Sequence, residues 1–395
     1  MPSAVRQVLA VLKFGVRSHA SRPRHAILMI AGFAIAAVTV SFMLAIPAGL
    51  EQLAVATGRS DLAIVLQADA RSEIGSTLSP SIVKIVSNLP GIARDSDGKP
   101  EVAPQYLASM PLRARDGAPV TAQLRGITAA TWDLLDMKAA QVLPNNFNPN
   151  SLQLLAGQDA VRILPSARPG AQLKVRDSLW RVEGLLSPGG TWNSELWGGI
   201  SVLQAAFNAP NVVSVLWVKL ANPDALAQFA TAIERDRRLY GVRVQSQRAY
   251  YAGKVRVLSR YARIAALAVA FFLGLGAIIA IGNAVSLALE GRQKELATLR
   301  ALGFRNPCLA MALFIEVLLV AFSTSIIVMA LVRWLASGMR FATSTGDHSF
   351  GFQLAITPQV FAWVVGYTAL LGIVSAILPS VHMLRAPLFR ALARD

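Results

Sequence analysis

The side chains best suited to charge-based chemistry in this sequence are gathered in one short stretch, residues 290–307. It contains Glu290, Arg292, Lys294, Glu295 and Arg300, whereas an apolar run without formal charge precedes it and a second long apolar run follows it. Acidic and basic side chains four positions apart meet on one face of a helix, as Glu290 and Lys294 would. Mixed charges at this spacing therefore favour a helix.

An amphipathic helix is the element that would present these charges. Leu296, Leu299 and Leu302 recur at three-residue spacing, and Gly303 followed by Pro307 supplies a stop signal. The apolar runs on both sides are each longer than the roughly 20 residues that span a bilayer. The stretch is therefore predicted to be a short helical turn between two membrane spans, placed to receive a push from a cytoplasmic partner.

Other kinds of chemistry are not indicated. A nucleotide-binding loop needs Gly-x-x-x-x-Gly-Lys-Ser/Thr, and Gly98-Lys99-Pro100 lacks both that spacing and the hydroxyl that holds magnesium. The Gly274-Leu275-Gly276 run lies inside an apolar segment without a preceding strand, so it favours close helix packing over dinucleotide binding. Cys308 is the only cysteine, and the four histidines are scattered. We expect no catalytic residue, metal site or bound cofactor in this chain.

The composition indicates a polytopic membrane protein. Hydrophobic residues make up 54% of the chain and charged residues only 15%, which is too apolar for a soluble protein of 395 residues. The net charge of +16 comes largely from basic residues near the ends of the apolar runs, a distribution that reflects membrane topology. Membrane lipid is therefore an expected partner, and nucleic acid is not.

Four spans are predicted, at residues 26–50, 258–289 (a stalk followed by the span proper from 264), 308–332 and 358–380. The N-terminal segment 1–25, the charged stretch and the tail 381–395 all carry an excess of Lys and Arg. The positive-inside rule places these three in the cytoplasm, so the domain at 51–257 and the loop at 333–357 would lie outside. The N-terminal segment could be a helix on the membrane surface or a simple tail, and both remain open.

Residues 51–257 have the mixed charges and turn clusters of a soluble domain. A strand near 61–67, a helix near 80–88 and a strand near 101–115 are followed much later by the same order at 212–220, 222–238 and 242–245. Two β-α-β units predict a porter-like α/β subdomain whose halves pair in space, with a β-rich subdomain inserted at about 118–208. The predicted fold class is thus four transmembrane helices with a large α/β extracytoplasmic domain.

Glu316 is the single acidic residue at membrane depth, where an isolated charge is costly. It could belong to a proton or substrate path. We favour a structural role, in which Glu316 is hydrogen-bonded to neighbours on the preceding span such as Asn283 or Ser286.

The charged stretch resembles the signature of the FtsX/MacB/LolC-type permeases of ABC transporters, which runs roughly Glu-Arg-Arg-x-Glu-Ile-Gly-x-x-Arg-Ala-Leu-Gly-Ala. The positions that match in order are Glu290, Arg292, Glu295, Arg300, Ala301, Leu302 and Gly303. One additional residue separates the two Glu, and Gly291, Ala297 and Phe304 depart from the pattern. The run from Pro379 to Leu392 is similar to the family's closing motif with one altered spacing. The order of one span, a large domain and three spans matches as well.

The resemblance implies the non-catalytic permease subunit of a mechanotransmission-type ABC transporter in the bacterial inner membrane. In that family the stretch is a coupling helix seated in a groove of a separate ATPase subunit, which binds ATP and Mg. The implied ATPase-coupling residues are Glu290, Arg292, Lys294, Glu295, Leu299, Arg300, Leu302 and Gly303. The leucine face would pack either into that groove or back on the spans. A second permease copy or a paralogue completes the implied complex, and the external part resembles a periplasmic domain that contacts an adaptor protein in some members.

Several functions remain open. The size of the external domain favours efflux with an adaptor, while lipoprotein release and regulation of cell-wall hydrolases are the alternatives within the class. A membrane-anchored sensor belongs to a different class, and the lack of a large predicted cytoplasmic domain counts against it. Four spans with one acidic residue at membrane depth and no pair of broken helices make a secondary transporter a poor fit.

Overall fold

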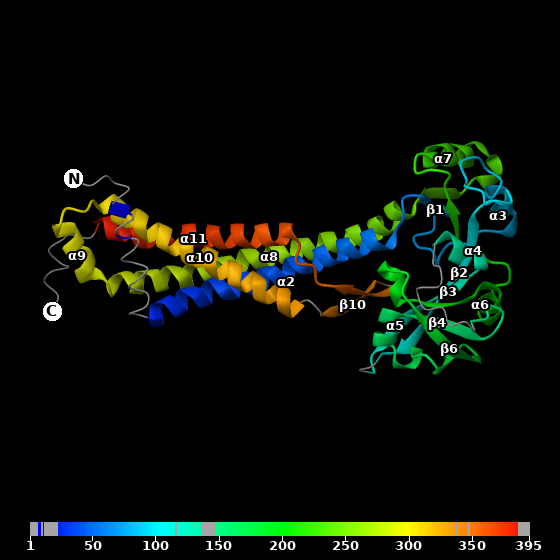
Figure 1. The fold of residues 1–395 in the computed structure, drawn as a ribbon, viewed down its shortest axis with the longest axis horizontal. Helices are drawn as coiled ribbons and strands as arrows, with labels where there is room; N and C mark the ends of the chain where they lie inside the picture. Colours follow the sequence, from blue (N-terminus) through cyan, green and yellow to red (C-terminus); the bar gives the residue numbers. More distant parts are fainter. Residues whose placement is uncertain are drawn as a thin grey trace. The chain divides into compact units, whose positions relative to one another are not determined.

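The computed structural model describes residues 7–8, 11, 23–114, 117–135, 147–336, 339–345 and 348–385. The chain divides into two compact units (Figure 1). The helical unit comprises residues 1–49, 259–339 and 354–395, and the globular unit comprises residues 50–258 and 340–353. Most of the predicted N-terminal segment and the end of the C-terminal tail lie outside the described residues.

Within the described residues, four helices are long and apolar enough to cross a membrane. They are α2 (Pro23–Thr57), α8 (Gln247–Glu290), α10 (Asn306–Ala336) and α11 (Pro358–Arg385). Each contains one of the predicted spans, which confirms the helical part of the predicted fold class. Two of them run well beyond the predicted span: α2 continues past Pro47 and ends immediately before Gly58, and α8 begins at Gln247.

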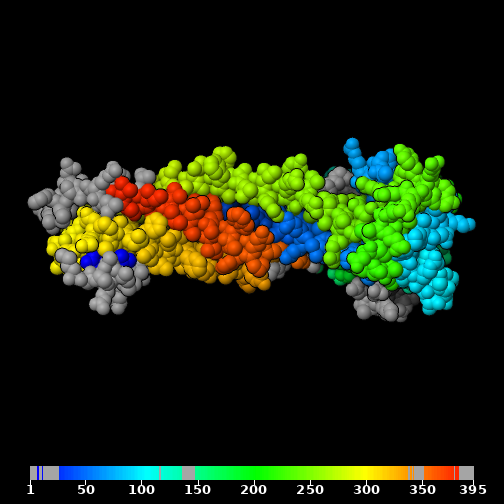
Figure 2. Space-filling view, turned by 90° about the horizontal axis from the view of Figure 1, so that it is seen from above, coloured from blue at the N-terminus to red at the C-terminus, as the bar shows by residue number. Residues whose placement is uncertain are grey.

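Small side chains bring the four helices of the bundle close together. Ala36 of α2, Ala284 of α8, Ala321 of α10 and Ala376 of α11 are buried in one cluster. A Cβ placed on Gly32 would come within 2.9 Å of Ile281, so these two helices approach closely at a glycine. Figure 2 shows α11 lying along the bundle between α8 and α10.

The outward faces of these helices expose large apolar side chains, as a lipid environment requires. Phe272 of α8 is 71% exposed, Trp334 of α10 is 72% exposed and Trp363 of α11 is 62% exposed. Such exposure would be costly in water, and in a bilayer it places apolar surface against acyl chains. The bundle is therefore built as the membrane part of the protein.

A mixed sheet organises the globular unit, and its nine strands in the described residues follow the order β5-β6-β4-β7-β3-β2-β8-β1-β9. One half resembles the predicted porter-like subdomain: β1 lies between β8 and β9, and β2 pairs with the other edge of β8. The elements of this half are β1 (Leu62–Gln67), α3 (Pro80–Val86), β2 (Val102–Arg113), β8 (Val215–Lys219), α7 (Ala225–Arg235), η3 (Arg237–Leu239) and β9 (Val242–Ser246). The two β-α-β units therefore meet in space, as expected.

The inserted segment continues the same sheet, because β3 pairs antiparallel with β2 from Pro119 to Gly126. Its elements are β3 (Pro119–Ile127), α4 (Ala129–Leu134), β4 (Gln153–Gly157), α5 (Gln158–Ile163), η1 (Pro165–Ala167), β5 (Gln172–Val175), β6 (Ser178–Leu186), η2 (Gly190–Ser194), β7 (Leu196–Gly199) and α6 (Ile200–Ala206). The predicted hairpin is formed by β5 and β6. Trp180, Trp197 and Trp217 are fully buried and fill the core on both halves. The α/β part of the predicted fold class is confirmed.

A hairpin forms in the segment between α10 and α11 that was expected to be a plain loop. It consists of β10 (Arg340–Thr345) and β11 (His348–Gln353), paired antiparallel. The hairpin belongs to the globular unit, where the Gly351 amide donates a hydrogen bond to Ser194 Oγ at 2.9 Å. A third segment of the chain, besides α2 and α8, thus enters the globular unit.

Candidate functional site

The charged stretch folds as the predicted short helix, α9 (Gln293–Ala301), directly after α8. Its end is defined by Gly303, whose φ of +92° lies in the left-handed region that favours glycine. The Gly303 amide donates to the Arg300 carbonyl at 3.0 Å and the Phe304 amide donates to the Leu299 carbonyl at 3.1 Å. These two bonds form a Schellman motif, so the stop signal in the sequence acts as a structural C-cap.

One face of α9 packs on the helical unit. Ala297 is buried, and Leu296 and Leu299 are partly buried beside Val11 and Leu309. Two of the three periodic leucines therefore pack back on the chain's own helices. The third, Leu302, is 72% exposed.

The predicted coupling residues thus separate into two groups by exposure. Glu290, Lys294, Leu302 and Gly303 are exposed, whereas Arg292, Glu295, Leu299 and Arg300 are partly buried. The exposed group contains charges of both signs and one leucine. Of the partly buried group, Leu299 packs on the helical unit and Arg292 pairs with Glu316 of α10.

Arg292 and Glu316 form an ion pair between the start of α9 and the middle of α10. Arg292 Nη1 lies 2.9 Å from Oε1 and 3.2 Å from Oε2 of Glu316, and the two side chains are only 12% and 8% exposed. The guanidinium compensates a carboxylate that would otherwise be expensive at this depth. The expectation that Glu316 bonds to Asn283 or Ser286 missed this partner, and the Asn283 side chain is exposed. Only the turn into α9 brings Arg292 back to α10, and residue spacing does not reveal it.

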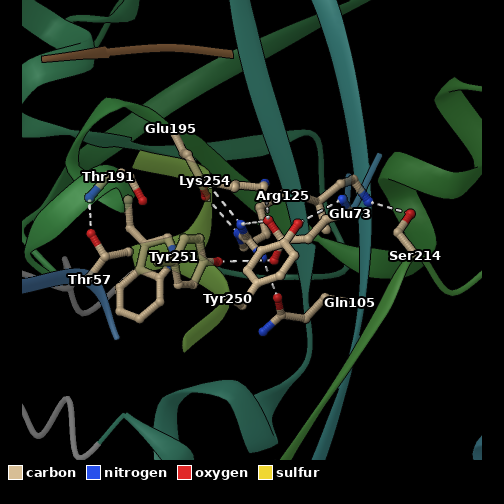
Figure 3. A network of polar contacts seen from close by, with 12 residues as sticks. Thr57, Glu73, Gln105, Arg125, Thr191, Glu195, Ser214, Tyr250, Tyr251 and Lys254 are labelled. Carbon is tan, nitrogen blue, oxygen red and sulfur yellow. Dashed lines mark hydrogen bonds and ion pairs between the residues drawn. The ribbon is translucent and has the colours of Figure 1, made fainter. Parts of the chain in front are cut away.

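A second polar site lies inside the globular unit, around the fully buried Arg125 of β3 (Figure 3). Its Nε and Nη2 donate to the two carboxylate oxygens of Glu195 at 2.6 and 2.8 Å, and Nη1 donates to Gln105 Oε1 at 2.6 Å. The guanidinium also lies 5.2 Å from the ring centroid of Trp217. A bidentate pair of this kind fixes both the position and the plane of the guanidinium.

Glu73 connects this arginine to the first turns of α8. Its Oε2 lies 3.6 Å from both Arg125 Nη2 and Lys254 Nζ, and its Oε1 accepts a hydrogen bond from Tyr251 at 3.0 Å. Lys254 Nζ lies 4.5 Å from the ring centroid of Tyr250, a cation–π distance. We call Arg125, Glu195, Gln105, Glu73, Tyr250, Tyr251 and Lys254 the Arg125 cluster. It joins the inserted segment, the porter-like half and α8.

The charges of the Arg125 cluster balance. Two cations, Arg125 and Lys254, face two carboxylates, Glu73 and Glu195. Burial opposes the charge on Arg125, but the neighbouring carboxylates, Glu195 first and Glu73 second, outweigh it and raise the pKa of Arg125 well above its ordinary value. The guanidinium therefore stays charged, and its position depends on both carboxylates remaining in place.

Sequence reasoning missed the Arg125 cluster because its members come from five separate parts of the chain. The local pattern is misleading, because the alternation of Gln123 and Arg125 with apolar residues is typical of a strand with one solvent-facing side, whereas every residue from Ala122 to Ile127 is buried. A charge inside a buried strand needs a partner. Its partners could not be found from spacing, since Glu73 and Glu195 lie far away on either side in the sequence.

The described residues contain no group of three His, Cys, Asp or Glu side chains that could hold a metal ion. The two sites carry charges that hold structural elements together and show no arrangement of nucleophile, base and orienting group. The binding of ATP and Mg by a separate subunit stays a prediction.

Residues 267–388 match the family model described as FtsX-like permease C-terminal. The matched region contains α9, α10, α11 and the end of α8. The match supports the expected resemblance of this part of the chain to the FtsX-type permeases of ABC transporters. Permeases that carry this domain are non-catalytic transmembrane components of ABC transporters, and such transporters contain a separate ATPase.

Two solved structures are similar to part of the chain. The extracellular domain of the noncanonic ABC-type transporter YknZ from Gram-positive bacteria is 14% identical with a TM-score of 0.35, and the match covers 47% of this chain and 100% of that chain. The periplasmic region of MacB from Actinobacillus actinomycetemcomitans is 15% identical with a TM-score of 0.36, over 49% of this chain and 92% of that chain. Scores this low support no inference about function. No curated protein matches the chain.

Arg292 and Glu316 should show thermodynamic coupling. Replacing Glu316 by Gln, or Arg292 by Met, deprives a buried charge of its counterpart, so each should destabilise the detergent-solubilised chain by about 1–3 kcal/mol. The double variant should lose less than the sum of the single losses in a double-mutant cycle followed by thermal unfolding. Glu290→Gln is the control, because that carboxylate is exposed. Additive losses would contradict the pairing.

Removing the cationic side chain of Arg125 should strongly destabilise the globular unit. Arg125→Met leaves Glu195 buried without its bidentate partner, and we expect a loss of about 3–5 kcal/mol in thermal unfolding of the globular unit within the full chain. Arg181→Met is the matched control, since Arg181 pairs with Glu183 on the neighbouring surface with its side chain 65% exposed. Exposed pairs contribute about 0–1 kcal/mol. Equal losses for the two variants would argue against a special role for Arg125.

Proposed function

We propose that this chain is the permease subunit of a mechanotransmission-type ABC transporter, in which ATP hydrolysis by a partner drives a conformational change of the globular unit. The observation that carries the proposal is that α9 is packed against the helical unit on one face and exposed on the other. One face is packed on the helical unit, while Glu290, Lys294 and Leu302 are exposed on the matched family segment. An element held on one side and free on the other can be pushed by a partner and pass the movement on.

The exposed residues of α9 are proposed to seat in a groove of the ATPase subunit. Leu302 supplies an apolar anchor, and Glu290 and Lys294 supply charges of both signs that set the orientation. Gly303 allows the left-handed turn that ends α9, since a Cβ at this φ would be strained. The half-buried side of α9 is proposed to hold the helix in place through Arg292, Glu295 and Arg300.

Movement of α9 is proposed to pass along α8 and through the Arg292–Glu316 pair into α10. A 44-residue helix that ends at Glu290 is about 66 Å long and contains no proline, so it can act as a rod. Its other end carries Tyr250, Tyr251 and Lys254, which belong to the Arg125 cluster. The continuity of α8 supports a mechanical role for the whole helix.

The proposed topology places both termini and α9 in the cytoplasm and the globular unit in the periplasm of a bacterial inner membrane. The excess of Lys and Arg in the segments 1–25, 290–307 and 381–395 supports this orientation. The exposed apolar side chains of α8, among them Phe272 and Ile279, offer surface for lipid or for a second permease copy or a paralogue. Efflux with an adaptor protein is the proposed physiological task, supported by the size of the globular unit.

The orientation can be tested with single cysteines. In a Cys308→Ser background, Leu179→Cys on the globular unit and Leu302→Cys beside α9 place thiols at similarly exposed positions, 61% and 72%. A membrane-impermeant maleimide should label the first in intact spheroplasts and the second only after permeabilisation. Labelling of Leu302→Cys from outside would overturn the proposed topology and the function that depends on it.

The contact with an ATPase can be tested with the same two leucines. Leu302→Asp removes the apolar anchor, so we expect the yield of copurified ABC ATPase, and its membrane-bound ATP turnover, to fall about tenfold or more. Leu179→Asp makes the same change at a similar exposure in the other unit and should leave both quantities unchanged. A chain that purifies without any ATPase from its native membrane would favour the membrane-anchored sensor instead.

A further inference from the structure

The short turn η2 (Gly190–Ser194) connects β6 to β7 in the globular unit. Gly189 and Gly190 have φ values of +90° and +60°, so the turn begins with two residues in the left-handed region. Gly190, Trp192 and Ser194 are buried. A buried turn that is not part of the sheet must find its hydrogen-bond partners in other segments.

The end of α2 provides the first partner. The Thr191 amide donates a hydrogen bond to Thr57 Oγ1 at 2.9 Å. A Cβ built on Gly190 would lie 2.1 Å from Thr57 Oγ1 and 2.5 Å from its Cα, so the last residue of α2 fits against η2 only because residue 190 is glycine. α2 and η2 are therefore in backbone contact.

The start of α8 provides the second partner. Trp192 Nε1 donates a hydrogen bond to the Tyr251 hydroxyl at 3.0 Å, and the two rings meet edge to face with centroids 5.6 Å apart. The same hydroxyl donates to Glu73 of the Arg125 cluster. Trp192 thus binds α8 at the residue where α8 joins the cluster.

The hairpin between α10 and α11 provides the third partner. Ser194 Oγ accepts a hydrogen bond from the Gly351 amide of β11 at 2.9 Å. A Cβ on Gly351 would lie 3.3 Å from Asp159 Cβ, so this strand also lies against α5. Thr191, Trp192 and Ser194 consequently bind three different segments.

These three segments are the ones through which the described chain passes between the helical and globular units. We infer that η2 is a junction at which α2, α8 and the β10–β11 hairpin act together on the globular unit. The inference rests on the proposed function, because it names the element that would receive movement from the membrane helices. From η2 the chain continues through Glu195, which holds Arg125, into β7 between β3 and β4. Displacement of the junction would therefore pass into the inserted half of the sheet.

Cooperation between the three contacts can be measured by hydrogen–deuterium exchange with mass spectrometry on the full chain in detergent, without nucleotide. Tyr251→Phe removes one oxygen on the α8 side, and Ser194→Ala removes one on the hairpin side. A junction predicts that Tyr251→Phe accelerates exchange of the Gly351 amide and that Ser194→Ala accelerates exchange of the Thr191 amide. Each rate should rise about fivefold to tenfold, as expected for weakening one buried hydrogen bond.

Two matched controls separate the junction from general destabilisation. Tyr106→Phe removes the same atom from another buried tyrosine. Gly170→Ala also places a side chain at a positive φ, +83°, but it has no neighbour within 4 Å of its added Cβ and so lacks the clash with Thr57. Gly190→Ala should accelerate both amides, and the two controls should accelerate neither. If Gly190→Ala does not fold, Tyr251→Phe and Ser194→Ala decide the question without it.

The outcomes also separate this inference from the proposed function. If Tyr251→Phe leaves exchange of the Gly351 amide unchanged and Ser194→Ala leaves exchange of the Thr191 amide unchanged, the three contacts are independent and the junction is refuted. That result is compatible with ATP turnover that depends on Leu302, in which case the permease function stands. Coupled exchange in a chain that binds no ATPase would instead support the junction and refute the function.

Discussion

Burial of the Arg125 cation is the constraint on which the globular unit depends. A guanidinium without solvent must be met by carboxylates, and here the two that meet it come from the two halves of the globular unit, Glu195 just before β7 and Glu73 after β1. Each carboxylate brings its own neighbours, so one charge defines how the inserted segment, the porter-like half and α8 fit together. Buried ion pairs contribute little net stability compared with apolar packing, and their use here favours a role in setting a unique arrangement.

The helical unit contains a buried ion pair as well. Glu316 is held by Arg292, so the helix α9 is attached by a charge pair on one side and by Leu296 and Leu299 on the other. Ion pairs lie near both ends of α8, Lys254 with Glu73 at its start and Arg292 with Glu316 just after its end. Its middle combines apolar packing with one directional contact, the hydrogen bond that the Tyr367 hydroxyl donates to the Ala270 carbonyl at 2.7 Å.

The local features of this fold could be predicted from the sequence, and the long-range ones could not. Apolar runs revealed the four long helices, and Gly303 revealed the end of α9, because both signals act over a few residues. The extension of α2 through Glu51 to Thr57 was missed, since the charge at Glu51 reads as the end of a span although the helix continues. The partner of Glu316, the members of the Arg125 cluster and the β10–β11 hairpin depend on contacts between distant segments. Periodicity contains no information on such contacts.

Pro47 gives α2 a property that α8 lacks. Because proline has no amide hydrogen, the carbonyl of Met43 loses its helical bond, and α2 has a place where it can bend or absorb a change of register. α8 has no proline, so one residue added within it would rotate the part of the helix beyond the addition by about 100° relative to the part before it. A change of register can be taken up at Pro47 in α2, whereas in α8 it would turn the side chains at one end of the helix relative to those at the other.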